Sequence, residues 1–303
     1  MWNGYRIFGV GGSMAALPAS GSLAGYFGTN GKGSAARMPI LCDMLNDIVA
    51  YALIEPKKKG GRALAMAHIK ACAALGCAGR KLLVFDRGYA SFKMVEELGK
   101  QGLYFLMRVK RKFNLEIYAQ EAAGGHVFLE KGGKRIKVRV VKFKLESGEM
   151  EMLITNVWEK RLGKKAFKKL CFLRWPTEVK YDIVKNKLQV GNFNAMAAEG
   201  AKQDFFACML LANLAAAAAA DALNEICRAR KKHQYKANMN ELVGIIKDHL
   251  ADAILKTARK GAKVARAIVV LAELYVVPRR PGRSTPRRAP RKGKFHHNKK
   301  ANC

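Results

Sequence analysis

Residues 81–111, KLLVFDRGYASFKMVEELGKQGLYFLMRVKR, contain an apolar run, a helix pattern and a second apolar run. The first run ends in Asp86 and a turn through Gly88, which is typical of a buried strand with an acid at its carboxyl end. Ser91 can cap the helix FKMVEELGK, which Gly102 ends, and LYFLMRVKR follows as another strand. The order strand, helix, strand predicts an α/β core.

The charge of the chain indicates a polyanionic partner. The 303 residues are 50% hydrophobic, which is enough for a real core, and carry a net charge of +33 from 56 basic and 23 acidic residues. A basic surface of this extent favours nucleic acid binding. A basic structural protein, such as a ribosomal component, is the alternative.

The cysteines and the apolar runs favour a protein of the cytoplasm. The seven cysteines form no C-x-x-C pair and no zinc spacing, so we expect reduced thiols. The first residues lack the pattern of a signal peptide. The run FFACMLLANLAAAAAA at 205–220 contains Asn213 and stops at Asp221, which predicts a buried helix and no membrane partner. We expect a cytoplasmic, nucleoid-associated protein.

The first eighty residues give mixed signals. The run YRIFGVGGSMAALP at 5–18 predicts β structure interrupted at Gly11 and Gly12, followed by a loop rich in Gly, Ser and Pro. Residues 38–56 fit either two strands or one helix, because their periodicity supports both. Residues 61–76, GRALAMAHIKACAALG, predict a helix that a glycine ends.

A different pattern covers residues 126–157. Three β segments are separated by Gly132 and Gly133 and by ESGE, which are hairpin signals. The middle segment, KRIKVRVVKFKL, alternates apolar and basic residues, so one face packs and the other is charged. This predicts an antiparallel sheet whose basic face either contacts DNA or is simply solvated.

The remainder of the chain is predicted to be helical. The expected helices cover about 166–190, 200–230 and 239–274, the last broken near Gly261. The final segment, PRRPGRSTPRRAPRKGKFHHNKKANC, contains ten Lys or Arg and no acid, which predicts a tail that stays disordered until it binds.

Residues 172–190, FLRWPTEVKYDIVKNKLQV, place Glu178 among basic residues. At about 100° per residue, a helix brings Arg174, Glu178 and Lys185 into one stripe. The spacing leaves two readings open: surface ion pairs that contribute little, or a polar site on a packed helix.

Two segments carry a family resemblance. LLVFDRGYAS and LRWPTEVKYDIVKNKLQVGNF resemble the DDE transposases of bacterial insertion sequences, of the insertion-sequence-four type. The signature of that type, Y-x2-R-x3-E-x6-K, falls on Arg174, Glu178 and Lys185, with Cys171 at the tyrosine position. QDFFACMLLANL and YKANMNELVGIIKD resemble the family's carboxyl-terminal half, so the resemblance covers nearly all of the chain.

The resemblance implies an α/β fold with a ribonuclease H-like core, in which a mixed sheet is covered by helices. An antiparallel β insertion would separate the second and third acids, and a helical C-terminal part would follow. The expected divisions are 1–102 for the first part of the core, 103–160 for the insertion, 161–275 for the helical remainder and 276–303 for the basic tail.

The resemblance also implies a reaction. Three carboxylates of the family hold two Mg²⁺ or Mn²⁺ ions for phosphodiester cleavage and strand transfer during DNA transposition and recombination. Asp86 would be the second acid and Glu178 the third, and both would bind metal. The residues expected to contact DNA are Arg174, Lys185, Arg87, Tyr89 and Arg108.

The first acid is missing from the expected place. The family has D-G-S or D-G-T followed closely by Pro on the first core strand, and GVGGSMAALP has Gly11 where that Asp belongs. The nearest downstream acid, Asp43, lies beyond a long loop and is not expected at the metals. Losing this carboxylate is expected to slow two-metal chemistry by several orders of magnitude. The chain also begins directly before this strand, so we expect that the family's amino-terminal DNA-recognition region is missing.

Three functions therefore remain. The chain is either an active transposase of a mobile element or a catalytically inactive DNA-binding derivative that inhibits an intact transposase, and these two rank close together. A basic RNA-binding protein ranks below them. The expected partners are DNA, at transposon ends and target, and a second copy or an intact transposase in a homodimer or mixed oligomer.

Overall fold

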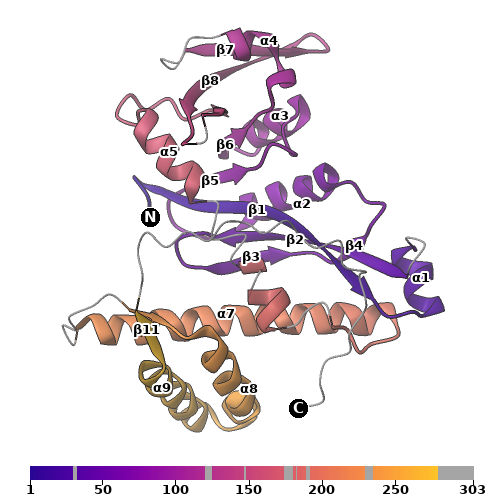
Figure 1. Ribbon diagram of the computed structural model, residues 1–303, viewed down its shortest axis with the longest axis vertical. Coiled ribbons are helices and arrows are strands. Elements are labelled where there is room, and N and C mark those ends of the chain that lie inside the picture. Colours follow the sequence, from indigo (N-terminus) through magenta and orange to yellow (C-terminus); the bar gives the residue numbers. More distant parts are fainter. Residues whose placement is uncertain are drawn as a thin grey trace. The chain divides into compact units, whose positions relative to one another are not determined.

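The computed structural model describes residues 1–29, 33–119, 125–146, 148–173, 180–181, 183–188, 192–228 and 235–278. The chain divides into two compact units (Figure 1). The first unit contains Met1–Met14 and Arg37–Lys180, and the second contains Ala15–Ala36 and Tyr181–Cys303. We describe each unit by itself.

A nine-stranded mixed sheet runs in the order β3-β2-β1-β5-β6-β9-β8-β7, with β4 paired to β2. Its strands are β1 (Tyr5–Leu17), β2 (Ser34–Asp43), β3 (Ile48–Ala52), β4 (Glu55–Pro56), β5 (Arg80–Phe85), β6 (Tyr104–Arg108), β7 (His126–Lys131), β8 (Lys134–Lys144) and β9 (Met150–Thr155). Strand β5 is parallel to both β1 and β6, whereas β2–β3, β6–β9 and β7–β8–β9 are antiparallel. The five strands β3-β2-β1-β5-β6, in this order, give the expected ribonuclease H-like α/β core. The predicted hairpins do not form a separate sheet, because β9 pairs with β6 and extends the core sheet.

Helices cover both faces of the centre of this sheet. The helices of the first unit are α2 (Gly61–Ala74), α3 (Phe92–Lys100), η1 (Arg111–Phe113), α4 (Leu115–Ala119) and α5 (Lys164–Phe172). Leu83 and Phe85 of β5 pack with α2 and α3, whereas Leu82 and Val84 pack with α5, because successive side chains of a strand point to opposite faces. Each such fully buried side chain stabilises the fold by roughly 1.5–3 kcal/mol.

Several expected elements are confirmed in the first unit. The strand β5, the helix α3 and the strand β6 follow the pattern of residues 81–111, and Ser91 Oγ accepts the cap hydrogen bond from the Met94 N–H at 3.3 Å. The helix expected at 61–76 is α2, and residues 38–56 form strands rather than a helix.

The predicted interruption at Gly11 and Gly12 is wrong. Strand β1 runs through both glycines without a break, because it belongs to a sheet in which it lies next to β2 and β5 and its backbone groups can pair. The ladder outweighs the roughly 1 kcal/mol that a glycine costs in a strand. The expected loop after β1 also contains a helix, α1 (Gly21–Phe27), which buries Leu23 and Phe27.

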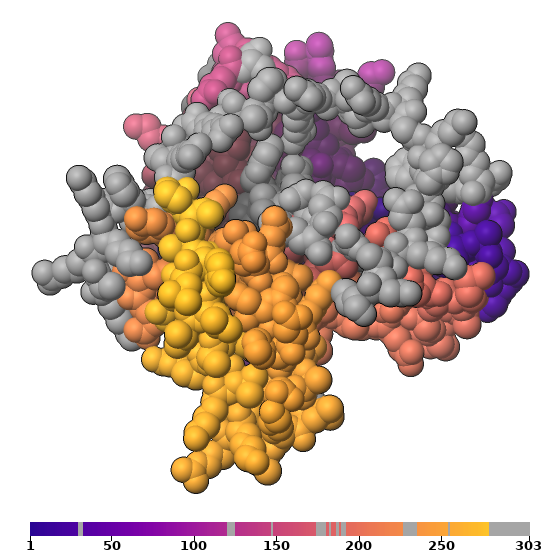
Figure 2. Space-filling model, turned by 60° about the horizontal axis from the view of Figure 1, so that its bottom comes forward, coloured from indigo at the N-terminus to yellow at the C-terminus, as the bar shows by residue number. Residues whose placement is uncertain are grey.

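The second unit is mostly helical. Its elements besides α1 are η2 (Ile183–Lys187), α7 (Ala198–Arg228), β10 (Tyr235–Ala237), α8 (Met239–Leu255), α9 (Ala258–Leu274) and β11 (Val276–Pro278). Helices α8 and α9 contact each other and α7, and their outer surface is coloured orange to yellow in Figure 2. The helix expected over 166–190 is described only as α5 and η2, since residues 174–179, 182 and 189–191 lie outside the described residues. The basic tail beyond Pro278 lies outside them as well.

The helix break expected near Gly261 is wrong. The chain breaks at Lys256 and Thr257, and Gly261 lies within the first turn of α9. A Cβ atom at Gly261 would stand 2.5 Å from the backbone oxygen of Ala253 in α8. The glycine therefore permits the close approach of α8 and α9 rather than ending a helix.

Helix α7 is long and apolar enough, over Ala198–Ile226, to cross a membrane by length and composition. It is the one such helix among the described residues, and 39% of its most apolar stretch is buried within the protein. The core helix of a soluble protein meets the same criteria, so this is weak evidence for a membrane span.

The described cysteines Cys42, Cys72, Cys77, Cys171 and Cys208 form no disulfide with one another, and all except the half-buried Cys77 are buried. Burial raises the pKa of Cys42 and Cys72 to about 12, so both remain protonated at neutral pH.

Candidate functional site

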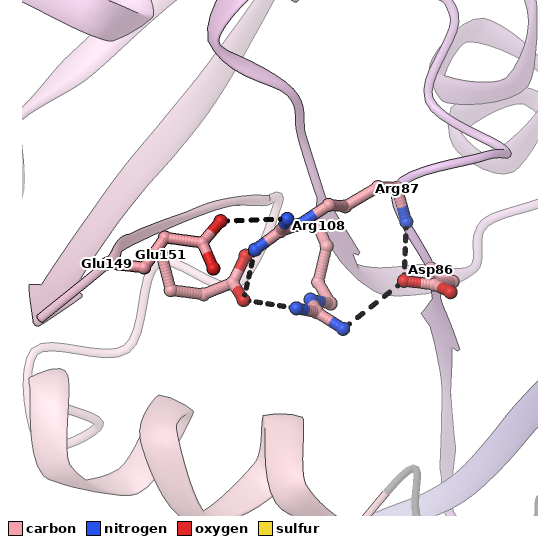
Figure 3. Close-up of polar contacts among 5 residues, drawn as sticks. All are labelled: Asp86, Arg87, Arg108, Glu149 and Glu151. Carbon is pink, nitrogen blue, oxygen red and sulfur yellow. Dashed lines mark hydrogen bonds and ion pairs between the residues drawn. The ribbon is translucent and has the colours of Figure 1, made fainter. Parts of the chain in front are cut away.

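The carboxyl ends of β5 and β6 bring Asp86 and Arg108 together (Figure 3). The two strands are parallel neighbours, with Phe85 opposite Met107, so the residues that end them meet at one edge of the sheet. Arg108 Nη1 lies 3.3 Å from Asp86 Oδ1, which also accepts the Arg87 N–H at 2.8 Å. The Asp86 side chain is 43% exposed, so this carboxylate remains open to a ligand.

Gly11 lies two residues beyond the end of the β1–β5 pairing. The parallel register ends with Gly9 opposite Val84, and Asp86 follows β5 by one residue, so continuing the register would bring position 11 opposite Asp86. Neighbouring strands are about 4.8 Å apart, so a carboxylate at position 11 would be next to that of Asp86. This is the position from which the expected first acid is absent.

Tyr89 lies at the same edge of the sheet. Its amide donates to the Asp86 backbone oxygen at 3.1 Å, and its ring packs against Phe85 with centroids 5.9 Å apart. A Cβ atom at Gly12 would lie 3.2 Å from the Tyr89 hydroxyl oxygen, so β1 and the loop after β5 approach closely here.

Two acids of the inserted strands hold the arginines of the site. Glu151 of β9 has a side chain only 2% exposed; its Oε2 lies 3.0 Å from Arg87 Nη2 and also accepts a hydrogen bond from Arg108 Nη2. Glu149 Oε1 lies 3.0 Å from Arg87 Nη1 (Figure 3). A buried carboxylate is stable only when paired, so Glu151 requires both guanidinium groups. It thereby fixes Arg108 against Asp86.

The pKa values of both arginines rise at this site. The hydrogen bond to Glu151 raises the pKa of Arg87 against the opposing effect of burial. Burial lowers the pKa of Arg108, but the hydrogen bond and charge of Glu151 outweigh it, and Cys171 and Asp86 add to the rise. The network therefore keeps two permanent cations beside Asp86. Cys171, at the signature tyrosine position, is buried on α5 near Arg108.

The other expected site residues lie outside the described residues or in the second unit. Arg174 and Glu178 lie outside the described residues. Lys185 lies on η2 in the second unit, where burial lowers its pKa. Within the first unit, the structure brings together Asp86, Arg87, Tyr89 and Arg108.

Asp43 does not replace the missing acid. Its Oδ2 lies 2.6 Å from Arg6 Nε, and its Oδ1 accepts the amides of Leu45 and Asn46 in the turn after β2. Arg6 precedes Gly11 by five residues of β1, a separation of about 17 Å at the usual strand rise.

Glu149 and Glu151 are the site residues that sequence reasoning missed. The available signal was an acid inside MEMLIT, an otherwise apolar segment, because a carboxylate inside a buried strand needs a cationic partner. The partners come from other strands, so the pattern of β9 alone does not identify them.

The described residues do not by themselves fit a two-metal site. Among them, no group of three or more His, Cys, Asp or Glu side chains could hold a metal ion. Asp86 shares its oxygen with Arg108, and position 11 offers no donor.

The sheet order and an acid at the end of the second parallel strand define a ribonuclease H-like α/β protein. The chain belongs to the family described as the transposase DDE domain, whose model matches residues 18–214. Proteins of this family generally use divalent metal ions.

Comparison with solved structures gives a weak likeness to the piggyBac transposase in a synaptic complex with hairpin DNA, determined by cryo-EM. The two chains are 11% identical with a TM-score of 0.46, and the match covers 88% of this chain. The present chain spans about half, 52%, of that protein. No curated protein matches this chain.

Proposed function

We propose that this chain is a DNA-binding, transposase-type protein of an insertion sequence, of the insertion-sequence-four type, that does not carry out strand transfer. The observation that carries the proposal is Gly11, two residues beyond the Gly9–Val84 pair, where continuing the register toward Asp86 reaches a residue without a carboxylate. The net charge of +33 supports DNA as the partner.

Two-metal chemistry would require three carboxylates around Mg²⁺ or Mn²⁺. This chain offers Asp86, and Glu178 by sequence, so one of the three expected carboxylates is missing. Asp86 instead has the Arg108 guanidinium 3.3 Å away, which supplies positive charge at the same oxygen. In this proposal Asp86, Arg87, Tyr89 and Arg108 form a DNA-contacting edge, and Arg174 and Lys185 contact phosphates elsewhere on the bound DNA.

Restoring the acid tests the proposal. Purified wild-type protein and the Gly11→Asp variant are each mixed with Mg²⁺ or Mn²⁺ and DNA that carries the terminal repeats of the element. We expect both proteins to bind the DNA, and only Gly11→Asp to cleave at the repeat boundary. Adding Asp86→Asn to Gly11→Asp should remove that cleavage. Equal cleavage by wild type and Gly11→Asp would refute the proposal.

An active enzyme is the second candidate, and the half-exposed Asp86 at the expected place favours it. It predicts wild-type cleavage that is lost in both Asp86→Ala and Glu178→Ala. A protein that binds RNA in preference to DNA, with no effect of these two substitutions, would instead support the third candidate.

A regulatory role follows from the first candidate. A binding-competent chain without strand transfer can occupy transposon ends or join an intact transposase in a mixed oligomer. We therefore expect it to inhibit transposition by an intact relative in the cytoplasm when the two proteins are expressed together.

A further inference from the structure

A basic groove lies beside the Asp86 edge in the first unit. It has a volume of about 410 Å³, and its lining includes Arg62, Arg87, Gly88, Lys110, Lys112 and Phe113. These residues come from the start of α2, the loop after β5 and the segment between β6 and α4. No Asp or Glu is among the described residues that line the groove.

The cations of this groove differ in how their charge is compensated. Arg87 is already paired with Glu149 and Glu151. In contrast, Arg62, Lys110 and Lys112 are exposed, and none forms an ion pair with any residue in the described part of the chain. Three uncompensated positive charges around one hollow create a local positive potential that attracts an anion.

The backbone of the groove allows close approach. Arg62 Nε donates to the Gly88 carbonyl oxygen at 3.2 Å, which holds the base of this guanidinium over the loop. A Cβ atom added at Gly88 would meet no atom within 4 Å, so there is open space beside this backbone. The loop leads directly into α3, whose N-terminal end carries partial positive charge.

We propose that this groove binds the phosphodiester backbone of a DNA strand, with Arg62, Lys110 and Lys112 as the phosphate contacts. The inference rests on the proposed DNA binding, and it adds contact residues other than Asp86 and the signature residues. Phe113 offers a half-buried aromatic ring on which a base of that strand can stack.

The surroundings of the groove favour a strand over a single phosphate. A second hollow of about 130 Å³, lined by residues that include Ser13, Arg37, Gly61 and Tyr89, adjoins the first through Gly61–Arg62 and Gly88–Ala90. The second hollow adds one basic residue, Arg37. Lys110 and Lys112 are exposed point charges on flexible stems, which suit contacts to a polymer backbone that carry no sequence information.

Salt-dependent DNA binding without metal tests the groove. The full chain in EDTA is titrated with labelled duplex and single-stranded DNA at several KCl concentrations, using fluorescence anisotropy. The triple variant Arg62→Gln, Lys110→Gln, Lys112→Gln should reduce the slope of log K against log salt by roughly 2 to 3, since each phosphate contact contributes about 0.7–0.9.

A matched control removes three other exposed lysines through Lys70→Gln, Lys131→Gln and Lys164→Gln. We expect the control to lower the slope by less than one. Gly88→Asp, which adds a negative charge in open space, should weaken binding at low salt without changing the melting temperature. Equal slopes for the groove triple and the control triple would overturn the proposal.

The outcomes separate this proposal from the proposed function. Groove-dependent binding in EDTA together with wild-type cleavage in Mg²⁺ refutes the inactive-transposase proposal and leaves the groove supported. Normal DNA binding by the groove triple refutes the groove and leaves DNA binding intact. Inorganic phosphate could instead raise the melting temperature of the wild-type protein but not of the groove triple variant, while DNA binding stays unchanged. That result would assign the groove to free phosphate and refute its binding of a DNA strand. Groove-dependent binding of RNA alone would refute it as well.

Discussion

Replacing Glu151 by Gln should destabilise the first unit while strengthening DNA binding. The substitution keeps the shape of a side chain that is 2% exposed but removes the negative charge that Arg87 and Arg108 share. Removing one partner of a buried ion pair costs about 3–5 kcal/mol. Because Arg87 and Arg108 retain 30% and 21% exposure, water screens the charges that remain, and the lower end of about 3 kcal/mol applies.

A loss of about 3 kcal/mol corresponds to a fall in Tm of about 6–12 °C for a unit of this size. The matched control is Glu130→Gln, because Glu130 pairs with Arg135 while both side chains are more than 60% exposed. We expect this control to cost less than about 1 kcal/mol. Thermal and urea unfolding of the three proteins measure the difference.

The same variant should bind DNA more tightly, since two guanidinium groups lose their internal counter-ion. We expect the slope of log K against log salt to steepen by about one to two for Glu151→Gln and to stay unchanged for Glu130→Gln. The reasoning is refuted if Glu151→Gln is no less stable than Glu130→Gln, or if the less stable variant binds DNA more weakly in proportion to its unfolded fraction.

Three further predictions concern stability and the tail. Burial lowers the pKa of His68 to about 4, so the folded state favours the neutral ring. The free energy of unfolding should therefore be highest above pH 6.5 and fall by about 3 kcal/mol as the pH drops toward 4. Urea unfolding of wild type should show this loss relative to His68→Leu, and parallel pH profiles would contradict it. Gly261→Ala should destabilise by about 1–3 kcal/mol through its clash with Ala253, whereas Gly244→Ala, in open space on α8, should stabilise by up to about 1 kcal/mol; thermal unfolding that ranks the two in the opposite order would contradict the close approach of α8 and α9. Deleting residues 279–303 removes ten Lys or Arg and should flatten the salt dependence of DNA binding, so an unchanged slope would argue against a strand-tracking tail.

Local sequence patterns predicted those helices and strands whose adjacent residues in the sequence favour the same structure. The strand, helix and strand of residues 81–111 form as expected, because apolar runs, a serine cap and a terminal glycine act over a few residues. Local patterns failed at Gly11 and Gly12, where membership of β1 in the sheet overrides glycine, and at Gly261, where a helix crossing rather than a helix end requires the small residue.

The sequence by itself determined the α/β class, the basic charge and the position of Asp86 at the end of a buried strand. The family resemblance predicted the first acid at position 11, where the sequence has Gly. Only the tertiary structure decided that β1 and β5 pair in parallel with Gly9 opposite Val84, that Glu151 fixes Arg108 at Asp86, and that Arg62 faces the same groove as Lys110 and Lys112. The physical reason is range: burial periodicity and capping act within a few residues, whereas strand register and ion pairing join residues that folding alone brings together.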